Sequence, residues 1–390
     1  MSHRADPLFL VELQKYGDVN IEACFNCGNC TAVCPLSSRE DSFPRRMIRY
    51  AQIGTKDRLL GSKELWLCYY CGECTASCPR QANPGEFMAA ARRYAIARYD
   101  PLGLAKMFFT SPLLSALFLV VLAVGLGVFM YTKHGPMSMD SMRLFEFIPV
   151  GVIHDLGVTM MAIAFLTGLW GAVNMVLHIA RVGGLPGSGR LNWFEALWEA
   201  IGLEVLSQRR YRQDCETYAE RQPWYLQKWF THAAMLWGFL GVLAATTLDY
   251  ALDILGLQPT GTWVPVWHPI RLLGTIAGIF LVYGSSAAII KRLLKNDEAS
   301  TYSTPSDWIF LILLWVSGVS GFVLEISLYL PEPQAWGYWT LLFHVAVSME
   351  LVLLLPFTKF AHAVYRTIAL YAYSLKPLPR TELAGTGSTD

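Results

Sequence analysis

Residues 24–35 read CFNCGNCTAVCP, and residues 68–79 read CYYCGECTASCP. Both stretches have the spacing C-x2-C-x2-C-x3-C-P, which is the ligand pattern of a [4Fe–4S] cluster. In modules with two such runs, the fourth Cys of each run serves the other cluster. We therefore expect two clusters, which transfer single electrons. The predicted ligand sets are Cys24, Cys27, Cys30 and Cys78 for one cluster, and Cys68, Cys71, Cys74 and Cys34 for the other.

The alternative for the two cysteine runs is a pair of zinc sites. Structural zinc is usually held by two separated C-x2-C pairs, whereas each run here places four Cys within eleven residues. The duplicated run therefore favours iron–sulfur clusters. Ligand thiolates persist in a reducing compartment, and the opening residues MSHRAD lack the apolar core of a signal peptide. The cysteine-rich head is therefore expected in the cytoplasm.

The composition divides the chain into a charged head and an apolar tail. Of the 390 residues, 54% are hydrophobic and only 16% are charged, and long apolar stretches dominate after residue 110. Pro44 suits the first turn of one head helix, and a second helix is predicted over 85–99, before Asp100-Pro101. We predict an all-α fold, in which residues 1–105 form a helical two-[4Fe–4S] ferredoxin-like domain.

Six segments of the tail are long and apolar enough to span a membrane. The first lies within 106–135, and residues 150–375 contain the other five around an amphipathic cytoplasmic loop at 181–228. Within that loop, Trp193 to Leu206 has helical spacing typical of an interfacial helix. Residues 379–390 are small and polar, and disorder is predicted there. The six predicted spans are 110–131, 155–180, 229–250, 269–292, 307–330 and 338–363.

The positive charges of the loops predict the orientation of these spans. With the head inside, the inner loops carry fourteen Lys and Arg residues, whereas the outer loops carry two, Lys133 and Arg143. This bias follows the positive-inside rule and agrees with the redox argument. We therefore expect six transmembrane helices in a prokaryotic cytoplasmic (inner) membrane, with both termini in the cytoplasm.

Two groups of arginines lie on the predicted head helices. They form either a docking face for an acidic partner or a solvated helix face beside anionic lipid headgroups. The two groups are Arg45, Arg46 and Arg49, and Arg92, Arg93 and Arg98.

Histidines inside apolar spans are costly, and their default interpretation is functional. His344 and His362 are eighteen residues apart in the last predicted span, so on one continuous helix they would face the same way, about 27 Å apart. His232 opens the third span at the depth of His362, and this pair predicts the axial ligands of a haem b near the head. Pro356 is expected to kink the helix between His344 and His362.

The outer half of the membrane holds further polar candidates. His268 and His154 are possible second ligands for a haem on His344, so one or two haems remain open. His178 ends the second span on the inner side, where it faces a haem propionate or a quinone. Three groups are candidates for a quinone site, and Glu350 is suited to pass protons there. These three quinone-site candidates are Glu350, Arg271 and His268. For each lone histidine, the alternative is an interfacial side chain bonded to the backbone.

Residues 341–362 run from LLFH to LPFTKFAH and resemble the final helix of the gamma subunit of respiratory nitrate reductase, a five-helix dihaem cytochrome b. The resemblance rests on a His, an apolar stretch, Pro-Phe-Thr-Lys and a second His. Residues 229–232, WFTH, resemble the start of that family's second helix, although Val242 stands where the family has a deeper His. The tail is therefore expected to contain a five-helix cytochrome b bundle.

A heterodisulfide-reductase C-like head fused to such a tail is similar to the QmoC family, which belongs to the quinone-interacting membrane-bound oxidoreductase, Qmo. The resemblance covers nearly the whole chain. It implies electron exchange between menaquinol or menaquinone and cytoplasmic flavin and iron–sulfur subunits of the same complex, linked to adenylylsulfate (APS) reductase. The sequence itself has no strand followed by G-x-G-x-x-G, so partners must supply the two-electron chemistry. Nothing in the sequence predicts nucleic-acid binding.

Two other functions compete with this quinone-linked electron transfer. The first is a heterodisulfide-reductase-type membrane subunit that serves a thiol–disulfide partner. The second is a membrane anchor that senses redox state through its clusters.

Overall fold

The computed structural model describes residues 5–38, 42–186, 191–209, 211–212, 223–257, 264–295 and 298–377. Over these ranges the chain is helical and contains no strand, apart from one isolated bridge between Leu191 and Pro377. The predicted all-α class is therefore confirmed for this part of the chain. The predicted disordered tail 379–390 lies outside the described residues.

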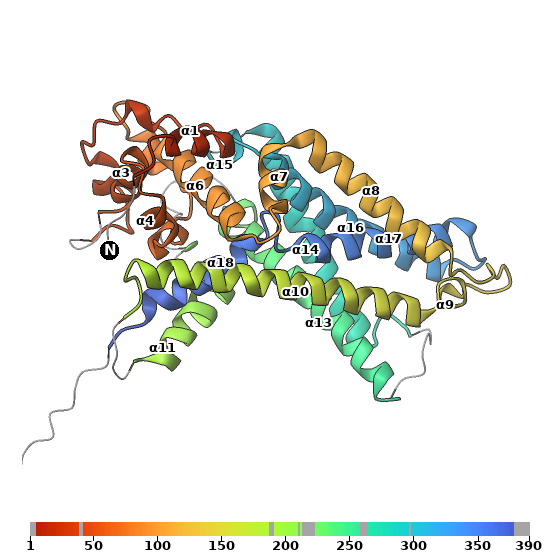
Figure 1. Cartoon of the computed structure of the whole chain (residues 1–390). Coiled ribbons are helices and arrows are strands. Elements are labelled where there is room, and N and C mark those ends of the chain that lie inside the picture. Colours follow the sequence, from red (N-terminus) through yellow and green to blue (C-terminus); the bar gives the residue numbers. More distant parts are fainter. Residues whose placement is uncertain are drawn as a thin grey trace, which may run out of the picture.

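The head consists of short helices that surround one long central helix (Figure 1). The central helix α6, Pro84–Tyr99, begins where the Asn83 side chain accepts a hydrogen bond from Glu86 N at 3.3 Å, and it ends before Asp100-Pro101. Most of its side chains are buried on all sides, which is typical of a helix at the centre of a domain. The short elements are α1 Phe9–Leu13, η1 Gln14–Tyr16, η2 Ile21–Ala23, α2 Asn29–Ala32, α3 Arg45–Gln52, α4 Lys56–Leu60, η3 Lys63–Trp66 and α5 Glu73–Ala76.

Six helices of the tail are long and apolar enough to cross a membrane, as the sequence predicts. Figure 1 shows them as an elongated bundle, with the head at the same end as α11 and α18 and the α9 connection at the other end. The six helices are α8 Pro112–Tyr131, α10 Val150–Arg181, α13 Lys228–Ile254, α14 Pro269–Leu294, α16 Pro305–Tyr329 and α17 Ala335–Leu354. Shorter elements connect them: α7 Leu104–Thr110, α9 Leu144–Phe147, η5 Trp224–Leu226 and α15 Glu298–Thr301.

The last predicted span, 338–363, is not one helix. Helix α17 ends at Leu354, residues 355–360 form turns, and α18 runs over Ala361–Ser374. Pro356 has no N–H to donate, and its ring excludes the carbonyl four residues earlier, so the α17 ladder stops there. The prediction that His344 and His362 share one helix with a kink at Pro356 was therefore wrong, because α17 ends and α18 begins between them.

The amphipathic segment predicted over 193–206 is helical. Helix α11 covers Trp193–Leu197, and a π-helix, η4, continues through Trp198–Leu206. Its aromatic residues remain exposed; Phe194 is 81% exposed and Trp198 is 61% exposed. Ala200 and Glu204 are buried on the opposite face. This division of apolar exposure suits a helix at a membrane interface.

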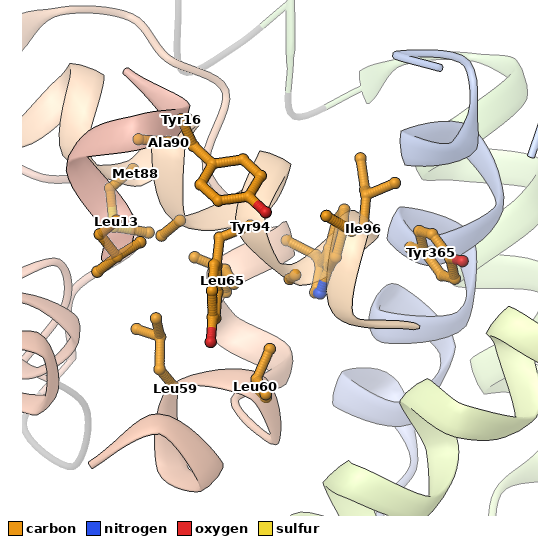
Figure 2. Close-up of a cluster of buried hydrophobic side chains, with 14 of the residues drawn as sticks. Leu13, Tyr16, Leu59, Leu60, Leu65, Met88, Ala90, Tyr94, Ile96 and Tyr365 are labelled. Carbon is orange, nitrogen blue, oxygen red and sulfur yellow. The ribbon is translucent and has the colours of Figure 1, made fainter. Parts of the chain in front are cut away.

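The head and the bundle share one hydrophobic core (Figure 2). The ring of Tyr365 on α18 packs against the head, 5.3 Å from Trp66 and 5.2 Å from Tyr99, measured between ring centroids. Burying an aromatic side chain of this size contributes about 1.5–3 kcal/mol. The core continues into the head around Tyr94 and Leu65, so the head is packed against the bundle as well as tethered to it.

Candidate electron-transfer site

The two cysteine runs fold into loops of the same shape. In each loop the residue before the second Cys has a positive φ, 68° at Asn26 and 57° at Tyr70. Gly28 and Gly72 follow with φ of 89° and 94°, and each glycine opens a one-turn helix. Because a side chain is strained in this left-handed region, glycine suits both positions. The duplicated sequence thus produces a duplicated backbone.

One cavity gathers four cysteines from both runs. Cys34 lines it together with Cys68, Cys71 and Cys74, so the last Cys of the first run lies with the first three of the second. Within this group, the amide of Tyr70 donates to Cys68 Sγ at 3.4 Å. Burial raises the pKa of the Cys34 thiol to about 12. An iron–sulfur cluster would remove this penalty, since a metal-bound thiol is deprotonated.

The remaining four cysteines form a second group, in which Cys24, Cys27 and Cys78 lie near Cys30. The pKa of the Cys30 thiol is raised by burial and by the neighbouring Cys24, Cys27 and Cys78. Cys27 is exposed, whereas Cys30 is buried. The amide of Ala82 donates to Cys78 Sγ at 3.4 Å. The crossed ligand sets, with Cys34 beside the second run and Cys78 beside the first, stay a prediction.

None of the eight cysteines of the two runs forms a disulfide in the described part of the chain. Among the residues that the structure describes, no three His, Cys, Asp or Glu side chains converge as ligands of a single metal ion would.

His232 and His362 face each other beside the head. They come from α13 and α18, and their ring centroids are 6.4 Å apart. His362 Nδ1 lies 2.5 Å from Lys359 O. Since a carbonyl oxygen can only accept, Nδ1 donates to it, and Nε2 of the neutral ring keeps its lone pair. His232 Nδ1 lies 2.9 Å from the Gln208 amide nitrogen. Each ring thus has a partner at Nδ1, as metal-binding histidines usually do.

Turned over, the amide of Gln208 would support the same tautomer for His232. Gln208 is 3% exposed, and its Oε1 is buried with no hydrogen-bond partner among the described residues. Turning the amide over would bring this oxygen to His232 Nδ1 as an acceptor and leave Nε2 free. Sequence analysis missed Gln208, because it follows the π-helix and reaches the site through a backbone with φ of 52°.

The three histidines expected in the outer half, His344, His154 and His268, do not form a facing pair like His232 and His362. His344 Nδ1 lies 2.9 Å from Ser320 Oγ, and its ring rests against Gly321, where an added Cβ would lie 3.2 Å from the imidazole. His154 instead pairs with Asp253 at 4.0 Å. His268 begins α14, and its Nδ1 is buried with no hydrogen-bond partner in the described part of the chain.

The other polar candidates also have defined surroundings. His178 Nδ1 donates to Asn174 O at 2.8 Å, within its own helix. Arg271 Nε lies 3.3 Å from Glu325 Oε1, so these two side chains form an ion pair. Glu350 is 2% exposed, and its Oε1 has no hydrogen-bond partner among the described residues.

A network of buried ions joins the head to α16. Glu86 accepts from Tyr70 Oη at 2.7 Å and pairs with Arg93 at 2.6 Å. Arg93 continues to Asp307 at 3.6 Å, and Asp307 pairs with Lys359 at 2.6 Å. Arg93 is therefore a buried structural residue, and the prediction that it forms part of an exposed docking face was wrong. Its position on a helix buried on all sides was not apparent from the sequence.

Comparison with known proteins divides the chain in the same way. Residues 20–82 match the family model of the 4Fe-4S dicluster domain, and residues 104–380 match that of citrate utilization protein B. Citrate utilization protein B of Escherichia coli is 27% identical over 149 residues, which are 37% of each chain. No solved structure matches the chain.

The head is similar to iron–sulfur components of heterodisulfide reductases. One component of the H(2):CoB-CoM heterodisulfide,ferredoxin reductase of Methanothermobacter thermautotrophicus is 36% identical over 62 residues, 16% of this chain and 34% of that protein. An iron-sulfur component of the CoB--CoM heterodisulfide reductase of Methanopyrus kandleri is 34% identical over 70 residues, 16% of this chain and 36% of that protein. The matches thus span about a third of the length of these curated relatives.

A 4Fe-4S dicluster head beside six candidate spans defines an iron–sulfur electron-transfer subunit with membrane-spanning helices. Two of the relatives named above are subunits of heterodisulfide reductases. More particularly, the chain belongs to the citrate utilization protein B family, whose model covers most of its length.

Proposed function

We propose that this chain exchanges electrons between menaquinol or menaquinone in the membrane and flavin-containing subunits in the cytoplasm. The predicted carriers are a haem b between His232 and His362 and two [4Fe–4S] clusters in the head. The observation that carries the proposal is the pair of facing imidazoles beside the cysteine cavity. A one-electron membrane carrier next to a one-electron cluster is the arrangement that a quinone-linked subunit needs.

The spacing of His232 and His362 suits two imidazoles that would hold one haem iron. With metal–nitrogen bonds of about 2 Å and about 1 Å from each nitrogen to its ring centre, two imidazoles that share one metal ion would have centroids about 6 Å apart. The observed separation of His232 and His362 is 6.4 Å. Nε2 of His362 is available as a ligand, and Nε2 of His232 would be available with the Gln208 amide oxygen turned to Nδ1. A bound haem would supply one-electron redox chemistry, and the protein holds both imidazoles in position.

His344 supports a second haem less well. His344 is hydrogen-bonded to Ser320, and within the described residues no contact joins His344 to His154 or His268. We therefore favour one haem on the inner side. The quinone-site candidates lie at two depths, since His268 and Arg271 are at the start of α14, whereas Glu350 is in the next-to-last turn of α17. Quinol oxidation releases protons as well as electrons, and Glu350 has a buried, unpartnered carboxylate oxygen that can accept one. Arg271 and His268 are further candidates for orienting the quinone.

The cytoplasmic partner follows from what this chain lacks. Its sequence has no dinucleotide-binding fingerprint, so flavin-containing subunits would carry out the two-electron chemistry. The resemblance to Qmo implies a link to APS reductase in sulfur metabolism. Membership of the citrate utilization protein B family favours a second possibility, in which the flavin partner acts on citrate or a related carboxylate.

The test is spectroscopy of the purified full-length protein in detergent. We expect a low-spin haem absorption band that responds to menadiol, a menaquinol analogue. The variant His232→Ala should lose this band, while His134→Ala should keep it, because His134 is exposed and stacks on Tyr131. A protein without a menadiol-responsive haem band would refute the proposal. An unchanged spectrum in His232→Ala would refute the inner ligand pair.

The same preparation separates the competing functions. A heterodisulfide-reductase-type subunit would pass electrons from its reduced clusters to a thiol–disulfide partner, with no response to menadiol. A redox-sensing anchor would show clusters that change state without supporting turnover between quinol and any acceptor.

A further inference from the structure

Two arginines converge on one peptide carbonyl between the head and the bundle. Arg92 Nη1 of α6 donates to Cys68 O at 2.6 Å. Arg366 Nη1 of α18 donates to the same oxygen at 3.2 Å and to Trp66 O at 2.6 Å. Within the described ranges, neither guanidinium forms an ion pair with a carboxylate. A neutral carbonyl does not balance two positive charges, so this location favours a nearby anion.

A cluster on the second set of cysteines would supply that anion. Cys68 lines the cavity together with Cys34, Cys71 and Cys74. A [4Fe–4S] cluster bound by four thiolates carries a net negative charge, and its reduction potential depends on nearby charges and hydrogen bonds. Two partly buried guanidinium groups at one of its ligands would stabilise the reduced, more negative form. They would therefore raise the reduction potential.

The same arginine connects this cluster to the histidine pair. Arg366 and His362 are four residues apart on α18, so they share one face of the helix. The Arg366 guanidinium also lies over the Tyr69 ring, 4.4 Å from its centroid. Tyr69 stacks on Tyr211 at 5.5 Å, and Tyr211 lies 5.7 Å from His232, both measured between ring centroids. A continuous set of packed side chains thus joins Cys68 to both histidines.

The first cysteine run has different surroundings. Arg45 Nε bonds Asn26 at 3.0 Å, and Arg80 Nε bonds Ala23 O at 3.3 Å. Both arginines are exposed, so water and salt screen their charges. Cys27 is exposed as well. These contacts lie within the head, and the exposed thiol favours exchange with a soluble partner.

We propose that the cluster of Cys34, Cys68, Cys71 and Cys74 is the one that exchanges electrons with the membrane, and that Arg366, together with Arg92, positions it and raises its reduction potential. This inference rests on the proposed function. Cys34, Cys68, Cys71 and Cys74 would hold a cluster that supplies one-electron exchange with the membrane carrier, with no bond made and no proton moved. Cys24, Cys27, Cys30 and Cys78 would hold a cluster that supplies exchange with the cytoplasmic partner.

The first test is a redox titration of the full-length protein, followed by electron paramagnetic resonance of the reduced clusters. Cys71→Ser and Cys27→Ser each remove or alter one cluster signal and so identify it. Arg366→Gln keeps hydrogen-bonding groups but removes the charge. We expect it to lower the midpoint potential of the cluster that Cys71→Ser removes and to leave the other cluster unchanged.

Two control variants separate charge from packing. Arg366→Lys retains the charge and should retain most of the potential, whereas Arg45→Gln at the first run should not change the potential of the second cluster. A shift in the cluster that Cys27→Ser removes, or equal shifts in both clusters, would overturn the inference. If Arg366→Gln loses its cluster, Arg92→Gln removes the same type of charge from the head side, and an unchanged potential there would overturn the inference too.

The second test follows electron entry from menadiol. In Cys27→Ser, the remaining cluster should still be reduced through the haem. In Cys71→Ser, the haem should be reduced, but transfer to the remaining cluster should be lost. The opposite pattern would refute the proposed cluster order while leaving the quinone-linked function intact. Failure of menadiol to reduce the haem in the unmodified protein would instead refute the function.

Discussion

Asp307 is the anion that holds together the ions between the head and the membrane helices. Its side chain is 2% exposed and receives Lys359 at 2.6 Å, Arg93 at 3.6 Å and Arg292 at 3.8 Å. It also lies in the first turn of α16, where it forms a capping box in which its carboxylate accepts from the Thr304 amide at 2.9 Å. Asp307→Asn would keep the volume of this side chain and remove its charge. Three cations would then share a site without their common counter-ion.

The expected cost follows from the burial of these groups. Removing one partner of a buried ion pair costs about 3–5 kcal/mol, because the remaining charge is left uncompensated. Arg93 belongs to the head, and the other groups belong to the bundle. The lost free energy should therefore appear chiefly as separation of the head from the membrane helices. Since 1.4 kcal/mol is a factor of ten, the released form should increase by about a hundredfold or more.

Limited trypsin digestion of the full-length protein in detergent measures this release. Exposed Arg98 and Lys106 flank the connection between the head and the first span, and cleavage there separates the two parts. At low protease concentration, the cleavage rate follows the population of the open form. We expect Asp307→Asn to be cleaved about a hundredfold faster than the unmodified protein.

The matched control is Asp140→Asn, which removes the same charge from an exposed position and should leave the cleavage rate unchanged. Equal cleavage rates for Asp307→Asn and Asp140→Asn would refute the reasoning. Lys359→Met combined with Asp307→Asn should recover part of the loss, because it removes one of the unpaired cations.

Two further substitutions test the packing of the bundle and the head. Gly238→Val should lower the melting temperature by the equivalent of about 1–3 kcal/mol, because a Cβ there would lie 2.5 Å from the backbone nitrogen of Leu281 on α14. Gly125→Val should leave the melting temperature unchanged, because nothing lies within 4 Å of the added Cβ. Equal losses of melting temperature in the two variants would contradict the close approach of α13 and α14. Tyr70→Phe removes the hydroxyl that donates to buried Glu86 at 2.7 Å, and we expect a loss of about 1.5–3 kcal/mol by thermal unfolding. An unchanged melting temperature would show that this hydrogen bond contributes little.

Local sequence patterns predicted the features that depend on local chemistry. The spacing of the cysteines predicts both loops, because a tight turn with Gly28 or Gly72 at positive φ is encoded within a few residues. The apolar runs predict six spans, because length and hydropathy are properties of one segment. The facing of His232 and His362 was predicted from their depth alone, since both lie near the inner ends of their segments.

Contacts between distant segments were not predictable in this way. Pro356 was expected to kink one helix. Instead the helix ends before Pro356, and a new helix begins at Ala361. A hydrogen bond from Lys359 N to Ser306 Oγ at 2.9 Å holds the connecting segment. Arg93 was expected on a surface, but it lies in the core because both the head and α16 cover it. Its sequence neighbours do not reveal that α16 lies nearby.

The amino-acid sequence by itself therefore determined the kind of chemistry, the helical class and the number of candidate spans. Only the tertiary structure decided which cysteine set lies beside the histidine pair. That choice depends on Arg92 and Arg366, which reach one carbonyl of Cys68 from helices more than 250 residues apart in the chain. The physical reason is that charge pairing and packing act through space, and a sequence pattern reports only on neighbours along the chain.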